Sequence, residues 1–156
     1  MSPLFNEMAE IADRYCTLIE QAGEKDSQWL HEVAVLLPKL HMAASSCPTQ
    51  EDEDAAAMGP DLDARFEIFA KLRQLLGSKD SYWMEFDVVH DGHHMTGSLA
   101  DDLTDIYCEL KQGLHLIDHE PNRALAGWCS GYSSHWGQHL LDAERHLYSL
   151  RTRDEF

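Results

Sequence analysis

The stretch that decides the fold runs from Ser98 to Ile117 and reads SLADDLTDIYCELKQGLHLI. Its apolar residues recur at steps of three and four, which is the spacing of one face of an α-helix. They are Leu99, Leu103, Ile106, Leu110, Leu114 and Ile117. Ser98 and Asp101 resemble a capping box, so we expect the helix to begin at Ser98. The pattern predicts a long amphipathic helix that buries one face in a core.

The segments before this helix carry the same periodicity. We expect one helix that is capped by Ser2 and ends near Gly23, because Gly is a common residue just past a helix end. A second helix is expected to begin at Asp26 or Ser27 and to kink near Ala34 to Leu37, because Pro38 lacks a backbone N–H.

A third helix is expected from Asp61 to Gly77, followed by a short helix at Ser81–Phe86. Within the third helix, the segment Arg65–Gln74 carries mixed charges and is expected to be a solvated face. No alternating strand pattern with hairpin signals is visible, so no sheet is expected.

Two segments interrupt the helical pattern. Residues from about 46 to 60 hold the run Glu51–Asp54, and this composition predicts a mobile acidic loop. Residues from about 87 to 97 are rich in His, Asp and Gly and are expected to form a second loop. Its cluster His90–His94 is interpreted as an exposed polar loop, with metal binding as the alternative.

The last helix is expected to run from Pro121 to about Leu150. A connection of only a few residues separates it from the helix at Ser98–Ile117, so the two should be antiparallel neighbours. Residues 1–156 are therefore predicted to form one all-α domain, a bundle of four or five main helices. The apolar Phe66 and Phe69 could close the core or a dimer, and the sequence leaves the oligomeric state undecided.

The chain is strongly acidic, with 28 Asp and Glu against 12 Lys and Arg and a formal net charge of -16. A field of this sign repels phosphate backbones and anionic lipid surfaces, so neither nucleic acid nor a membrane is expected as a partner. A basic protein is the more natural partner. Acidity that only keeps the protein soluble is the alternative.

The four cysteines are expected to be reduced. Cys16, Cys47, Cys108 and Cys129 include no CxxC pair and match no zinc-finger spacing. No signal peptide is visible either, because the first residues include acids and no basic stretch. These features together predict a cytoplasmic protein.

Titratable side chains follow one flank of each of the last two long helices. A helical wheel with 100° per residue gives the carboxylates Asp102, Asp105 and Glu109 on one flank and the histidines His135, His139 and His146 on the other. Antiparallel packing brings the two flanks together. The connection near His119 sets the register, which makes His135 and His139 the expected partners of Asp102.

Three interpretations of these residues compete. They could form a structural polar contact, in which imidazole groups satisfy half-buried carboxylates. They could hold a divalent transition metal, since His135 and His139 are four residues apart and Asp102 or Asp105 could add an oxygen ligand. They could also perform acid–base catalysis, but no nucleophile motif accompanies them.

The function therefore stays open at this point. The absence of catalytic signatures favours a non-enzymatic accessory or protein-interaction module without an evident cofactor. The alternative is a metal-binding protein or metalloenzyme that uses His135, His139 and Asp102.

Two motifs add a family resemblance. The aspartate run followed by Ile106-Tyr107, and the segment His135-Trp136-Gly137-Gln138-His139, resemble the bacterial helical family catalogued as domain of unknown function 5063. The resemblance singles out Asp101, Asp102, Asp105, Tyr107, His135, Trp136 and His139. It implies an all-helical fold and a bacterial cytoplasmic setting, and it implies no activity because the family has none assigned.

Overall fold

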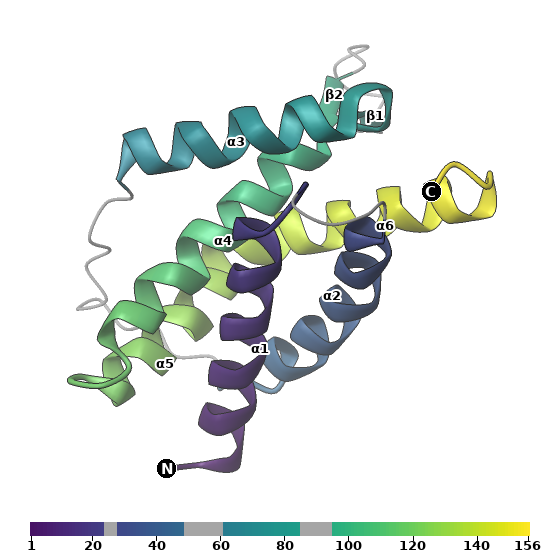
Figure 1. Ribbon diagram of the computed structural model, residues 1–156. Coiled ribbons are helices and arrows are strands. Elements are labelled where there is room, and N and C mark those ends of the chain that lie inside the picture. Colours follow the sequence, from purple (N-terminus) through teal and green to yellow (C-terminus); the bar gives the residue numbers. More distant parts are fainter. Residues whose placement is uncertain (24–27, 49–60, 85–94) are drawn as a thin grey trace.

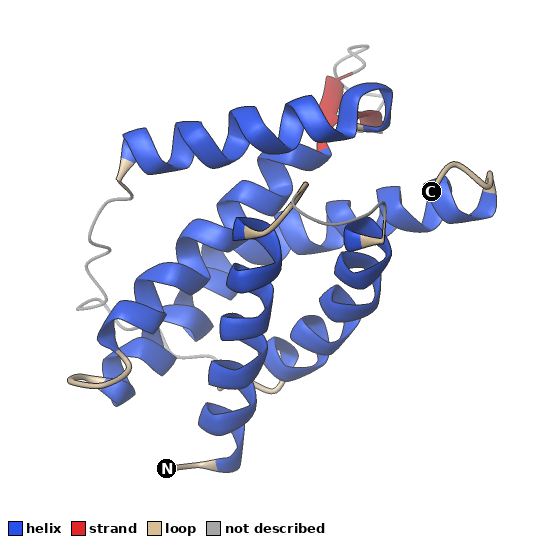
Figure 2. Ribbon diagram, viewed as in Figure 1, coloured by secondary structure: helices blue, strands red, loops and turns tan. Residues whose placement is uncertain are grey.

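The computed structural model describes residues 1–23, 28–48, 61–84 and 95–156. Helices account for most of these residues (Figures 1 and 2). The α-helices are α1 (Pro3–Glu20), α2 (Trp29–Ser45), α3 (Leu62–Leu76), α4 (Leu99–Leu116), α5 (Pro121–Gly131) and α6 (Gly137–Thr152). The shorter elements are the 3-10 helix η1 (Gly77–Lys79), the strands β1 (Ser81–Met84) and β2 (Met95–Ser98), and the π-helix η2 (Tyr132–Trp136). The prediction of an all-α domain is confirmed.

Helix α4 is the centre of the bundle. It packs against α1, α3, α5 and α6, and Figure 1 shows these helices arranged around it. Four residues of the predicted apolar stripe, Leu99, Leu103, Ile106 and Leu110, are at 0% exposure, and its last two, Leu114 and Ile117, are partly buried against the core. The N-cap is also as predicted, because the Ser98 hydroxyl accepts the Asp101 N–H at 3.2 Å. The sequence therefore identified the helix around which the fold is built.

The helix that follows α4 is antiparallel to it, as predicted, but it is not one regular α-helix. Helix α5 passes through η2 into α6, and the Gly137 N–H reaches back five residues to the Tyr132 carbonyl. A Cβ at Gly137 would lie 2.3 Å from that carbonyl oxygen, so the widened turn requires glycine there. Counted as one helix, α5, η2 and α6 give five main helices in the described residues.

The prediction of a short helix at Ser81–Phe86 is wrong, and so is the expectation of no sheet. Ser81–Met84 forms β1, which pairs antiparallel with β2 and brings Tyr82 opposite Gly97. A Cβ at Gly97 would lie 2.3 Å from the Tyr82 ring, so the glycine lets the ring lie across the neighbouring strand. Strand β2 also takes the last residues of the expected loop at 87–97. Short aromatic strands of this kind carry too few residues for a period to be seen.

Some predictions fall on residues that the structure leaves out. These are the cap at Asp26 or Ser27, the acidic run Glu51–Asp54 and the cluster His90–His94. Helix α2 does continue past Pro38 to Ser45. Among the helices in the described part of the chain, none is long and apolar enough to cross a membrane.

The expectation of four reduced cysteines is wrong. Cys47 and Cys129 form a disulfide with their Cα atoms 5.4 Å apart, and Cys16 and Cys108 are free thiols. The bonded residues are 82 positions apart in the chain. Only the packing of the helices brings them together, so sequence spacing could not reveal the pair.

Candidate functional site

Four carboxylates line the face of α4 that is turned toward α3 and α6. Asp101, Asp105 and Glu109 follow one another at steps of four, and Asp102 lies beside the first of them. Because residues four apart share a helix face, these groups form a continuous acidic strip. Asp102 is 4% exposed and Asp105 is 9% exposed, so both require hydrogen-bond donors.

His139 of α6 lies between two of these carboxylates. Its Nδ1 donates to Asp102 Oδ1 at 2.8 Å, and its Nε2 lies 3.1 Å from Asp105 Oδ2. The predicted pairing of His139 with Asp102 is thus found in the structure. With a carboxylate at each ring nitrogen, the imidazole is placed where either a second proton or a metal ion would be stabilised.

The electrostatics of this contact follow from its burial. The hydrogen bond to Asp102 raises the pKa of His139, and the charges of Asp105 and Asp102 add to this effect against the opposing effect of burial. Burial raises the pKa of Asp102, while the hydrogen bonds from His139 and Tyr82 oppose that increase. The proton on His139 is therefore held more tightly than on an exposed histidine.

His135 does not pair with Asp102, which corrects the expected partner. Its Nδ1 lies 2.9 Å from Glu109 Oε1 instead. Four residues separate the two histidines, which is about 6 Å along a helix axis. In an antiparallel pair this step moves His135 toward the C-terminal end of α4, where Glu109 lies. The two imidazole rings remain neighbours, with centroids 5.1 Å apart.

Arg65 of α3 is a member of the site that the sequence did not indicate. Its Nε and Nη2 donate to Asp105 Oδ1 at 3.0 and 2.8 Å, and Nη2 also donates to Asp101 Oδ1 at 2.9 Å. The expectation that Arg65 lies on a solvated face is wrong for this residue. Mixed charges on a helix give no sign of such a contact, since it depends on how α3 crosses α4.

Tyr82 of β1 is the second residue that the sequence missed. Its hydroxyl donates to Asp102 Oδ2, so both oxygens of that carboxylate have donors. The Tyr82 ring stacks on His146 with centroids 4.8 Å apart. His146 was expected along the same flank as the other histidines, but its Nε2 donates to the Lys79 carbonyl at 2.6 Å. Strand β1 thus contributes a hydrogen-bond donor to the site.

Two residues that the family resemblance singled out lie elsewhere. The Tyr107 hydroxyl donates to Glu20 of α1 at 2.8 Å. Trp136 is fully buried, and its indole N–H donates to the Trp128 carbonyl at 3.1 Å. That bond helps to satisfy the backbone next to η2. We therefore define the His139 cluster by the residues that share one site: Arg65, Asp101, Asp102, Asp105, His135 and His139.

The His139 cluster has the chemistry of a metal site. Asp105, His135 and His139 each offer a ligand atom, and these atoms lie within 4.8 Å of one another. Asp101, Asp102 and His139 form a second such group. Ligand atoms of a tetrahedral ion with bonds of about 2.1 Å are about 3.4 Å apart. The observed 3.1 Å between His139 Nε2 and Asp105 Oδ2 is close to this spacing.

Comparison with known proteins supports the fold and adds no activity. Protein BF1032 from Bacteroides fragilis has a similar crystal structure, with a TM-score of 0.76 and 22% sequence identity, over 96% of this chain and 92% of that chain. This likeness shows a shared fold. No curated protein matches the chain. The model of a domain of unknown function, DUF5063, matches residues 1–153, which confirms the resemblance noted in the sequence. Since this match covers almost the whole chain, the protein belongs to the DUF5063 family.

Proposed function

We propose that the His139 cluster binds one divalent transition-metal ion through Asp105, His135 and His139. The observation that carries the proposal is a repeated geometry. Each histidine directs Nδ1 to a carboxylate, His139 to Asp102 at 2.8 Å and His135 to Glu109 at 2.9 Å. Such carboxylate–histidine pairs orient the ring and leave Nε2 to coordinate a metal. This site has two such pairs and a further carboxylate, Asp105, which is more than a simple polar contact requires.

In this proposal Asp102 orients a ligand and does not itself bind the ion. Both of its oxygens already accept hydrogen bonds, from His139 and from Tyr82. Asp105 is the better oxygen ligand because Arg65 holds Oδ1 and leaves Oδ2 facing His139. The sequence left Asp102 and Asp105 open as the oxygen ligand, with Asp102 in the preferred set, and these contacts favour Asp105 instead.

The ligand set also points to a class of ion. Two imidazole nitrogens and one carboxylate oxygen suit zinc, iron, nickel and copper, whereas calcium and magnesium prefer oxygen ligands throughout. The guanidinium of Arg65 compensates part of the negative charge of Asp101 and Asp105. A divalent ion would therefore enter a site that holds three carboxylates, Asp101, Asp102 and Asp105, and one guanidinium. The net negative charge of these groups attracts a cation.

Calorimetric titration of chelator-treated protein with Zn²⁺ and Co²⁺ tests the proposal. We expect one ion per chain in the wild type and loss of binding in His139→Ala. The matched control is His41→Ala, which breaks the His41–Glu144 pair of 2.8 Å outside the cluster and should bind as the wild type does. Unchanged binding by His139→Ala, with its helical circular dichroism retained, would refute the proposal.

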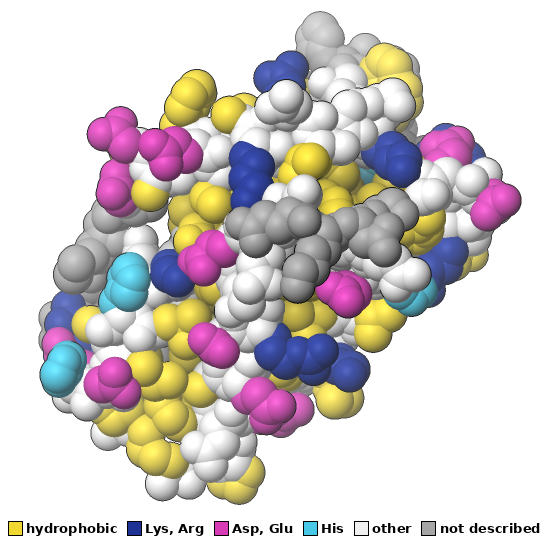
Figure 3. All heavy atoms as spheres, in the orientation of Figure 1, with side chains coloured by type: hydrophobic (Ala, Val, Ile, Leu, Met, Phe, Trp, Pro, Cys, Tyr) yellow, Lys and Arg dark blue, Asp and Glu magenta, His cyan; other side chains and the backbone are white. Residues whose placement is uncertain are grey.

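A second function, independent of the metal, is an accessory role in a bacterial cytoplasm through a basic protein partner. Its support is the net charge of -16. On the face shown in Figure 3, Asp and Glu are interspersed with Lys and Arg, so the attraction would be long-range and sensitive to salt. A single basic protein should co-purify at low salt and dissociate at high salt. Association that resists salt would contradict this role.

A further inference from the structure

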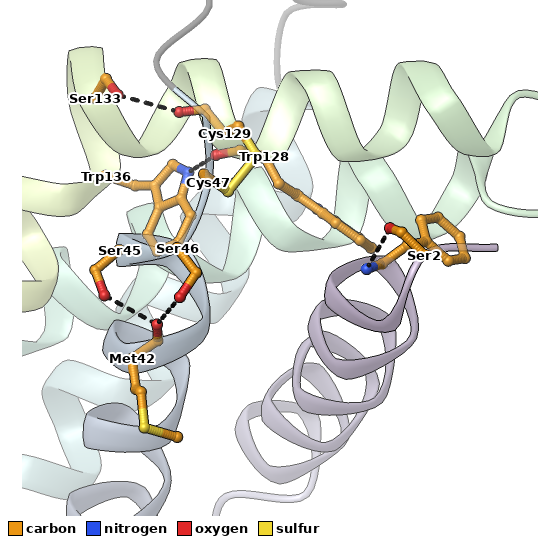
Figure 4. Close-up of a disulfide and its surroundings, with 10 residues drawn as sticks. Ser2, Met42, Ser45, Ser46, Cys47, Trp128, Cys129, Ser133 and Trp136 are labelled. Carbon is orange, nitrogen blue, oxygen red and sulfur yellow. Dashed lines mark hydrogen bonds between the residues drawn. A yellow bond between two sulfur atoms is a disulfide. The ribbon is translucent and has the colours of Figure 1, made fainter.

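The disulfide joins two parts of the bundle that otherwise pack on different helices. Cys47 directly follows Ser46, the C-cap of α2, and Cys129 lies on α5. Helix α2 packs chiefly against α1 and α6, whereas α5 packs chiefly against α4. Figure 4 shows the bond between the end of α2 and the helix that carries Trp128. The bond therefore supplies a connection that the helix packing itself provides only weakly.

The two bonded cysteine residues differ in exposure. Cys129 is 6% exposed, whereas Cys47 is half-buried at the end of its helix. Because Cys47 is the more exposed of the two residues, we expect an incoming thiolate to attack its sulfur. The leaving group is then the Cys129 thiolate, which lies against the bundle.

The other two cysteines do not compete for this bond. Burial raises the pKa of Cys16 to about 12, and burial raises the pKa of Cys108 to about 11. Thiols with such values are almost entirely protonated at neutral pH, and the protonated thiol is a poor nucleophile. Exchange of the Cys47–Cys129 bond thus depends on a reductant from outside the protein.

We propose that Cys47–Cys129 is a reversible redox latch, opened by an external dithiol, that fastens the end of α2 to α5. One thiolate of the dithiol attacks Cys47 Sγ, the S–S bond breaks, and Cys129 leaves as a thiolate that takes a proton from water. The second thiolate of the dithiol then displaces Cys47, which is protonated in turn. Two electrons pass from the dithiol, now a disulfide, to the protein, now a dithiol.

The opened state should differ from the closed state only near the bond. The last turn of α2 is held by the amides of Ser46 and Cys47, which donate to the carbonyls of Ala43 and Ala44. These bonds lie at a helix end beside exposed side chains, where fraying costs little once the tether is gone. On the other side, the Cys129 carbonyl accepts the Ser133 hydroxyl at 3.3 Å, so the start of η2 shares the effect (Figure 4).

Thiol counting is the first test, carried out on the full chain purified without reductant. Alkylation in denaturant should label two of the four cysteines, and peptide mapping should find Cys47 linked to Cys129. Treatment of the folded protein with dithiothreitol before alkylation should raise the number from two to four. Removal of the reductant with mild oxidation should restore two.

Hydrogen exchange then tests the latch itself. Reduction should remove protection at the amides of residues 46 and 47 and in α5, while α1 keeps its protection. The variant Cys47→Ser should show the reduced pattern with or without dithiothreitol, and Cys108→Ser, the matched control, should respond as the wild type does.

Three results would overturn the proposal. They are four free thiols in protein that was never reduced, a bond that dithiothreitol opens only after denaturation, and reduction without any change in exchange. None of these measurements involves the His139 cluster, so they test the redox latch independently of the proposed metal site.

Discussion

Two histidine–carboxylate pairs bridge α4 and the helix that follows it, and they differ mainly in burial. His139–Asp102 and His135–Glu109 have similar lengths, 2.8 and 2.9 Å. The side chains are 23% and 5% exposed in the first pair, and 50% and 26% exposed in the second. The first pair also has further partners on Asp105 and Tyr82. The same type of ion pair is therefore buried at His139–Asp102 and close to solvent at His135–Glu109.

Because of this difference in burial, we expect the two pairs to have different roles. The buried pair holds its ring rigidly and belongs to the stability of the domain, because an unpaired partner there would be left without water. The exposed pair contributes little to stability and leaves His135 accessible from solvent. A metal ion would thus meet one fixed ligand and one adaptable ligand.

The largest expected effect comes from removing the buried carboxylate. Asp102→Ala leaves His139 Nδ1 and the Tyr82 hydroxyl without their acceptor, which should lower the free energy of unfolding by about 3 kcal/mol. Glu109→Ala should cost only about 0.5 kcal/mol because its pair is partly solvated. Urea denaturation of the two variants measures both values. Equal losses would show that burial does not distinguish the pairs.

An intermediate effect is expected at Tyr82. Tyr82→Phe removes one donor to the buried Asp102 carboxylate and should cost about 1.5 kcal/mol, the worth of a hydrogen bond to a charged group. It should also weaken metal binding about tenfold, as changes behind a metal ligand do. The control is Tyr107→Phe, whose hydroxyl meets the exposed Glu20, with a cost below about 0.5 kcal/mol. Similar losses of unfolding free energy in both variants would show that the Tyr82–Asp102 hydrogen bond contributes no more to stability than an exposed one.

The smallest effect is a change of stability with pH. Because the pKa of His139 is raised in the folded protein, folding favours its protonated form. That contribution is complete below the ordinary histidine pKa of about 6.5 and is lost as the pH rises through the raised value. The difference in unfolding free energy between wild type and His139→Gln should therefore shrink as the pH rises above about 6.5.

Urea denaturation at several pH values, with a chelator present, measures this trend. In an Asp102→Asn background the trend should largely vanish, since the hydrogen bond that His139 donates to Asp102 is the main cause of the raised pKa of His139. A difference that grows with pH would mean that His139 is stabilised in its neutral form.

The core and the candidate site were predictable to different degrees. The stripe of Leu99, Leu103, Ile106 and Leu110 was readable because its period is a property of the chain itself. The pairing of His139 with Asp102 was also predictable, since a short connection limits the register of two antiparallel helices. The partner of His135 was not, because Asp102 and Glu109 lie on the same face of α4 two helical turns apart, and the local pattern does not choose between them.

Other parts of the site come from elements far away in the sequence. Arg65 and Tyr82 reach the carboxylates of α4 from a helix and a strand whose local patterns show no link to them. The same holds for Cys47 and Cys129, which meet across 82 residues.

The sequence by itself determined the long helices, the buried face of α4 and the acidic strip beside it, because each follows from periods of three to four residues within one segment. The tertiary structure decided that Arg65 and Tyr82 contact the carboxylates of α4, and that Cys47 and Cys129 form a disulfide. Those contacts depend on crossing angles and registers between segments, and no local pattern carries that information.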